Sequence, residues 1–129
     1  MTAAALCPCG SGRDYALCCG RYHAQTEHAP TAEALMRARY TAYVLGLEEY
    51  LRATWHPDTR PEALDLDVPP RPKWLGLSVK THRPIDDSHA TVEFVARYKL
   101  NGRAFRLHEI SRFERVAGQW VYVNGEMKD

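Results

Sequence analysis

All four cysteines of this chain lie in one N-terminal segment, CPCGSGRDYALCC, at residues 7–19. A Cys-x-Cys pair is followed, after eight residues, by an adjacent Cys-Cys pair. Four soft thiolates within reach of one short loop suit a tetrahedral zinc ion. Pro8, Gly10 and Gly12 favour the tight turns that a chain needs to wrap an ion. The sequence therefore predicts a zinc site formed by Cys7, Cys9, Cys18 and Cys19.

Two alternatives to this site remain open from the residues alone. His23 follows the cluster closely and could replace Cys19 as the fourth ligand. The thiols could also be free and redox-active, and labile thiolates would favour a redox or metal-sensing protein. A site closed by four thiolates leaves no position for water, so we expect a structural role and no catalysis at the metal.

The same segment resembles the SEC-C motif, a small zinc knuckle found at the C-terminal end of the SecA translocation ATPase and in many bacterial proteins. In that motif the metal ligands are the Cys-x-Cys pair and the final Cys-Cys or Cys-His pair, which correspond to the four cysteines of this chain. The resemblance implies a knuckle over residues 1–25 that docks a protein or ribosomal partner.

The overall composition is that of a soluble globular protein, with 45% hydrophobic and 26% charged residues. A net charge of +1 creates no global field that would recruit nucleic acid or an acidic membrane. No apolar run approaches the roughly 18 residues needed to cross a bilayer. The N-terminus lacks the basic segment of a secretory signal. We therefore expect a cytoplasmic protein, in which thiols stay reduced.

Helical periodicity begins after a polar linker. Apolar residues recur at three- and four-residue steps over 31–45, and Thr31 is the expected N-cap. Gly46 interrupts this pattern, and a second helix is predicted over 47–56, where Pro57 ends it. Two consecutive helices are therefore expected in the first half of the chain.

The second half of the chain alternates apolar and polar residues, as half-buried strands do. A proline-rich loop at 57–73, with a short turn at 61–65, precedes this region. Turn residues such as Asn101-Gly102 predict antiparallel hairpins. Three or four antiparallel strands are expected, within 74–84, 89–100, 105–116 and 119–127. Helices followed by an antiparallel meander indicate the α+β class.

This order of elements is similar to the nuclear transport factor 2-like fold, a cone of N-terminal helices packed on a curved antiparallel sheet. Together with the knuckle, the stretches RARYTAYVLGLEEYLRATWHP, TVEFVARY, LHEISRFER and GQWVYVNG resemble the YchJ-like family of uncharacterised bacterial proteins. The resemblance implies a cone domain over residues 31–129 and no established activity. Longer members carry a second SEC-C motif, whereas no cysteine follows Cys19 here, so we expect no function that needs two knuckles.

Polar residues on the predicted strands could turn the hollow of the cone into an active site. In a hydrolase- or isomerase-like reaction, a histidine would be the general base, a glutamate would orient it and an arginine would bind an anionic substrate. The candidates are His56, at the end of the second predicted helix, and five strand residues: His108, Glu93, Glu109, Arg97 and Arg112. Strand alternation places His108 and Glu109 on opposite faces, which weakens this hypothesis. Cross-strand ion pairs among the glutamates and arginines explain the same residues without catalysis.

The stretch 97–115 contains six lysines or arginines and only two acidic residues, interleaved with aromatic ones. Single-strand nucleic-acid binders show this pattern, but a solvated strand face and core aromatics explain it better, so we do not expect nucleic-acid binding. The sequence favours an adaptor, in which the knuckle docks a partner and the cone binds a small ligand or a second chain. The alternative is a small-molecule enzyme that uses the cone pocket. An exposed sheet is also compatible with a homodimer.

Overall fold

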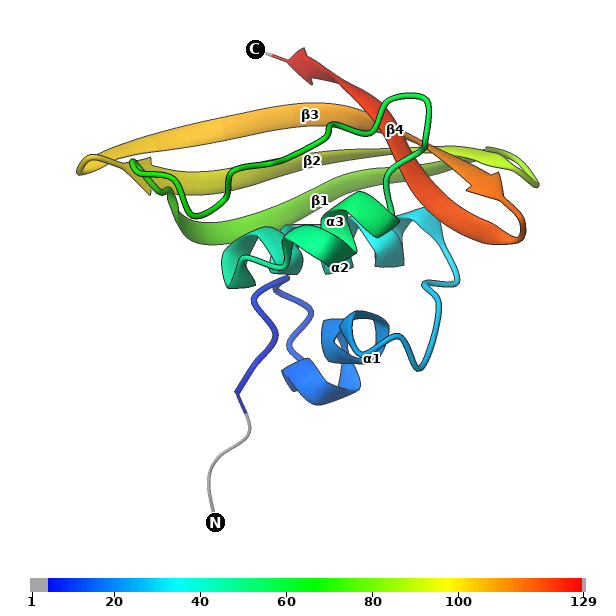
Figure 1. The fold of residues 1–129 in the computed structure, drawn as a ribbon, viewed down its shortest axis with the longest axis horizontal. Coiled ribbons are helices and arrows are strands. Elements are labelled where there is room, and N and C mark those ends of the chain that lie inside the picture. Colours follow the sequence, from blue (N-terminus) through cyan, green and yellow to red (C-terminus); the bar gives the residue numbers. More distant parts are fainter. Residues whose placement is uncertain (1–4, 129) are drawn as a thin grey trace.

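The computed structural model describes residues 5–128 and contains a four-stranded sheet, a layer of helices and an N-terminal knuckle (Figure 1). Helices α2 (Ala32–Leu45) and α3 (Glu48–Ala53) lie between the sheet and the knuckle. The described part of the knuckle, residues 5–25, contains a 3-10 turn, η1 (Tyr15–Leu17), and helix α1 (Cys19–His23). Two main helices precede the strands, so the predicted α+β class is confirmed.

The sheet is an antiparallel meander with strand order β1-β2-β3-β4. Its strands are β1 (Lys73–Asp86), β2 (His89–Leu100), β3 (Arg103–Val116) and β4 (Gln119–Lys128). At the hairpin between β2 and β3, Asn101 and Gly102 have φ angles of 52° and 80°, as the predicted turn requires. Register shifts interrupt the pairing of β1 with β2 at three places, and such bulges bend a sheet. This curvature leaves a concave face toward α2.

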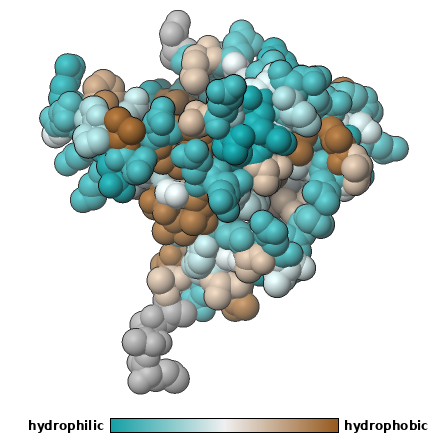
Figure 2. Space-filling view, in the orientation of Figure 1, coloured by the Kyte–Doolittle hydropathy of each residue, from teal (hydrophilic) through white to brown (hydrophobic). Residues whose placement is uncertain are grey.

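Helix α2 begins and ends as the sequence predicts. The Thr31 hydroxyl accepts a hydrogen bond from the Ala34 backbone N–H at 3.1 Å, and Gly46 ends the helix with a φ of 74°. Figure 2 shows a largely hydrophilic surface with an apolar patch over the junction of α2 and α3, where Leu45 is exposed.

Helix α3 is shorter than the predicted 47–56. It ends at Ala53 because the following residues leave the helix and pair with β4. The His56 N–H donates to the Tyr122 carbonyl, and the Tyr122 N–H donates to the Thr54 carbonyl, each at 2.8 Å. The periodicity of the sequence therefore predicted a helix about one turn too long. In that last turn, the backbone pairs with a distant strand and does not continue the helix.

Helix α2 is buried on two sides. Toward the sheet, Met36 and Tyr40 pack with Phe94 and other apolar residues of the main core. On the side away from the sheet, the fully buried Ala38 packs against the knuckle cysteines. The helix is therefore the shared wall between the cone and the knuckle.

The segment between α3 and β1 contains no helix or strand, in agreement with its proline content, but its turns lie at 57–59 and 66–67 and not at 61–65.

Within residues 5–128, no helix combines the length and the apolar character that a membrane crossing would need.

Candidate metal centre and cone cavity

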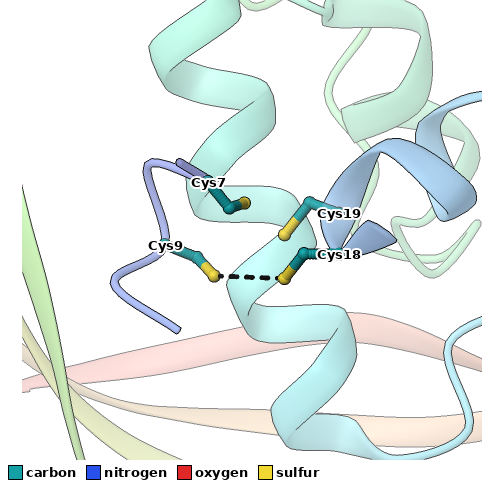
Figure 3. A group of neighbouring side chains, drawn as sticks. All are labelled: Cys7, Cys9, Cys18 and Cys19. Atoms are coloured by element: carbon teal, nitrogen blue, oxygen red, sulfur yellow. Dashed lines mark hydrogen bonds between the residues drawn. The ribbon is translucent and has the colours of Figure 1, made fainter. Parts of the chain in front are cut away.

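The four cysteine side chains converge on one point. Cys7 and Cys9 come from the loop before η1, and Cys18 and Cys19 come from the start of α1 (Figure 3). All four Sγ atoms lie within 4.8 Å of one another, and those of Cys9 and Cys18 are 3.6 Å apart. A tetrahedral ion with metal–sulfur bonds of about 2.3 Å requires sulfur–sulfur distances of roughly 3.8 Å. The thiols are unbridged and buried, so the cluster could hold a metal ion.

Local backbone geometry brings the two pairs together. The Cys7 N–H donates to the Arg13 carbonyl at 2.8 Å, which closes the loop between the pairs. Gly10 has a φ of 80°, a conformation that side chains disfavour. At Gly20, a Cβ atom would lie only 2.8 Å from the Tyr15 carbonyl oxygen, so α1 could not pack on η1 with any larger residue there. Glycines therefore permit the tight wrapping that the site needs.

Hydrogen bonds and burial shift the pKa values of three of the four thiols. The pKa of Cys9 falls to about 4, chiefly because Cys19 donates a hydrogen bond to its sulfur, with help from Ser11 and Cys7. The pKa of Cys19 is raised because its proton is engaged in that bond and because burial disfavours its thiolate. Burial also raises the pKa of Cys18. Since the thiolates of Cys18 and Cys19 are disfavoured in the bare cluster, a divalent cation would be needed to stabilise them.

Helix α2 contacts the cluster from the side that faces the sheet. The Thr41 hydroxyl donates to the Cys19 sulfur at 3.5 Å and lies 3.7 Å from the Cys7 sulfur. Arg37 Nη1 donates to the Cys9 carbonyl at 2.8 Å. Arg37 and Thr41 are not among the residues that the cysteine motif predicts for this site. A stripe of small residues at helical spacing, Ala34, Ala38 and Thr41, was the signal that this side of the helix is also packed.

His23 takes a different position from the one that a fourth ligand would need. The Tyr15 hydroxyl donates to its Nδ1 at 2.6 Å, and its Nε2 donates to the Ala38 carbonyl at 2.8 Å. Burial lowers the pKa of His23, which favours this neutral form. Both ring nitrogens are therefore occupied, and His23 tethers the knuckle to α2.

A second candidate site is a cavity of about 320 Å³ between α2 and the concave face of the sheet. Its walls are mainly aromatic and apolar, and its buried polar residues are Arg39, Glu109 and Ser111. The cone is therefore hollow and not filled by its own side chains.

Arg39 is the unexpected residue of this cavity, because it lies on the apolar side of α2 and is only 4% exposed. Its Nη1 donates to the Leu51 carbonyl at 2.8 Å and to the Thr54 hydroxyl at 2.7 Å. Its guanidinium lies over the rings of Trp55 and Tyr122, 4.8 and 4.6 Å from their centres. Burial lowers the pKa of Arg39 to about 10, so it remains a cation at neutral pH.

Glu109 lies in the same cavity and is 7% exposed. The hydroxyl groups of Ser111 and Tyr122 donate to its Oε2. Gly125 on β4 makes this position available, because a Cβ atom there would overlap the Glu109 carboxylate. None of the ion pairs among residues 5–128 includes Glu109, so its expected cross-strand ion pair is wrong.

The remaining candidate catalytic residues do not line this cavity. His108 contacts Glu93 at 2.7 Å on the opposite face of the sheet from Glu109, and Arg97 is exposed on β2. Arg112 donates to Asn124 at 2.9 Å. His56 lies 3.8 Å from Glu114. The structure thus separates the histidines from Glu109.

In comparison with known proteins, the cone and the knuckle match two separate families. The family model described as the YchJ middle NTF2-like domain matches residues 31–125, and that of the SEC-C motif matches residues 5–21. A UPF0225 protein of Cupriavidus pinatubonensis is 58% identical over 94% of this chain and 87% of its own length. A UPF0225 protein of Chromobacterium violaceum is 57% identical over 95% of this chain and 93% of its own length.

Two solved structures share the fold. The solution structure of a SEC-C motif containing protein from Rhodopseudomonas palustris has a TM-score of 0.85 and 38% identity, over 95% of this chain and 98% of that one. The crystal structure of a SEC-C motif containing protein from Psychrobacter arcticus has a TM-score of 0.78 and 30% identity, over 95% of this chain and 82% of that one. These matches confirm the NTF2-like cone, and the chain belongs to the YchJ-like UPF0225 family.

Proposed function

We propose that the protein is a zinc-dependent binding module of the bacterial cytoplasm, in which the knuckle docks a protein or ribosomal partner and the cone receives a small molecule. The observation that carries this proposal is the closed sulfur cluster packed against α2. Because α2 also forms a wall of the cone cavity, one metal ion would hold both binding surfaces in a fixed relation.

Zinc is the metal that suits this donor set best. Four thiolates in tetrahedral reach select zinc over oxygen-loving cations such as magnesium or calcium. The cluster supplies four protein ligands, which supports a structural ion and not one that activates water. The reducing cytoplasm would keep the thiols available.

The Thr41 hydroxyl provides a test of zinc binding that leaves every ligand in place. Thr41→Val keeps the shape of the side chain and removes its hydrogen bonds to Cys7 and Cys19. We expect the zinc dissociation constant to rise about tenfold, because groups that bond to ligands tune metal affinity by such factors. Competition with a chromophoric chelator measures the change. Thr59→Val is the matched control, since Thr59 bonds to Val123 outside the knuckle, and equal affinities for both variants would contradict the role of Thr41.

The outward face of the knuckle supports docking of a partner. Leu6 and Leu17 are 66% and 64% exposed, although apolar side chains of a small knuckle would be expected to pack inward. Arg13 is exposed on the same small unit, and apolar side chains are visible on the knuckle surface in Figure 2. Exposed leucines on a small unit that also carries an exposed cation are typical of a surface that binds another macromolecule.

A double variant, Leu6→Ser with Leu17→Ser, tests this docking surface. We expect unchanged zinc content but at least about tenfold weaker capture of partners, since two apolar anchors are lost. Co-sedimentation with purified ribosomes and cross-linking in cell extract distinguish the two kinds of partner. The matched control is Val68→Ser with Leu75→Ser, which removes exposed apolar residues outside the knuckle. Identical partners and yields for both double variants would exclude docking through the knuckle.

The cavity supports binding in the cone more than the enzymatic alternative. Histidine-dependent hydrolysis or isomerisation would require a histidine near Glu109, whereas His108 and His56 lie elsewhere. The cavity instead offers aromatic walls and two buried charged groups, the composition of a ligand pocket.

A further inference from the structure

We propose that the cone cavity binds a neutral, planar molecule of one or two fused rings that presents a hydrogen-bond acceptor to Arg39 and a donor to Glu109. A cyclic amide is the simplest chemical class that carries both groups. This ligand class rests on the proposed role of the cone as a receptor for a small molecule.

The walls of the cavity suit a flat ring system. Seven aromatic side chains from both layers of the fold line it: Tyr40, Tyr43, Trp55, Trp74, Phe94, Phe113 and Tyr122. Aromatic faces and edges attract planar rings and exclude water from their surroundings. The volume of about 320 Å³ lies at the small end of ligand sites, which leaves room for one or two rings.

Arg39 offers unused donors to such a ligand. Both of its hydrogen bonds to described residues come from Nη1, so Nε and Nη2 have no partner among residues 5–128. The rings of Trp55 and Tyr122 hold the guanidinium in place. An acceptor on the ligand would therefore meet donors that are already oriented.

Glu109 determines the charge that the cavity accepts. None of the ion pairs among the described residues joins Arg39 to a carboxylate, yet Glu109 places one negative charge on the same cavity. The two groups together make the cavity electrically neutral. A charged ligand would leave an uncompensated buried charge, which is costly. A neutral ligand with an acceptor and a donor satisfies both groups without that cost.

The three tryptophans allow binding to be located in the zinc-loaded protein. Trp55 and Trp74 line the cavity, whereas Trp120 lies outside it. A ligand in the cone should therefore shift two of the three indole N–H signals in a heteronuclear NMR spectrum. Three bicyclic probes of similar size separate the chemical classes: carbostyril is a neutral lactam, naphthoate is an anion, and naphthalene has no polar group.

Carbostyril should bind at least about tenfold more tightly than naphthoate or naphthalene, the effect of one well-made hydrogen bond to a buried charge. Glu109→Gln leaves Arg39 without its opposite charge, so naphthoate should gain about tenfold in affinity while carbostyril loses affinity. Glu93→Gln is the matched control, because Glu93 lies on the opposite face of the sheet and should change neither affinity.

The outcomes separate the two levels of the proposal. If naphthoate binds the unaltered protein more tightly than carbostyril, the neutral ligand class is wrong and the receptor role of the cone stands. If no probe shifts the Trp55 and Trp74 signals at millimolar concentration, both fail. Zinc content and the Trp120 signal verify that each variant is folded. Should Glu109→Gln unfold, the rank order of the three probes on the unaltered protein decides.

Discussion

Cys9→Ser is expected to empty the metal site and to lower the thermal midpoint by on the order of 15 °C. Cys9 is completely buried in the sulfur cluster, so a serine there removes a ligand that no described neighbour can replace. A ligand present at a thousand times its dissociation constant stabilises a protein by about 4 kcal/mol, and a structural metal is in this regime or beyond it. Loss of the ion would also release the knuckle from Ala38 and Thr41 of α2.

Metal analysis and a thermal scan, with and without a chelator, measure this effect. The chelator should lower the midpoint of the unaltered protein to that of Cys9→Ser and should leave the variant unchanged. Leu17→Ser, an exposed substitution in the same knuckle, is the control and should retain one equivalent of zinc. A Cys9→Ser protein that keeps its metal, or melts within about 2 °C of the unaltered protein, would refute a structural metal site.

Gly125→Val is expected to lower the free energy of unfolding by about 2–4 kcal/mol. The new side chain would overlap the Glu109 carboxylate, which then has to leave its hydrogen bonds with Ser111 and Tyr122. Overpacking costs about 1–3 kcal/mol, and a buried carboxylate without partners adds to that cost. Denaturant unfolding monitored by tryptophan fluorescence gives the difference.

Two further variants isolate the overlap with Glu109 from other effects. Asn124→Val introduces the same side chain one residue away on β4, at an exposed position, and should change the free energy of unfolding by less than about 1 kcal/mol. Glu109→Ala should recover part of the loss in the Gly125→Val background, since removal of the carboxylate creates space. Strictly additive effects of the two substitutions would contradict the contact between Gly125 and Glu109.

Much of the fold could be predicted from local patterns. The strands and hairpin turns follow from alternation and from Asn101-Gly102, and the limits of α2 follow from Thr31 and Gly46, because each signal acts within a few residues of itself. The end of α3 could not be predicted in this way. Residues Thr54 to His56 continue the helical pattern, but their backbone groups pair with Tyr122, a residue far along the chain.

The same contrast between local signals and long-range pairing applies to the candidate sites. The spacing of the cysteines indicated a metal cluster because ligands close in sequence meet through local turns. The catalytic candidates were drawn from polar residues on strands, where the sequence gives alternation but not the partner of each side chain. Pairing on the outer face brings His108 to Glu93, while Glu109 turns inward beside Gly125.

By itself, the sequence determined the family, the order of helices and strands, and the sulfur cluster at the N-terminus, since these depend on motifs and on short-range periodicity. Only the tertiary structure decided that α2 is packed on two sides and that Arg39 and Glu109 share one cavity. The physical reason is that the burial of a side chain depends on which other elements of the fold cover it, and not on its residue type alone. A threonine or an arginine on a helix becomes a neighbour of the sulfur cluster or part of a cavity wall only when another layer of the fold covers it.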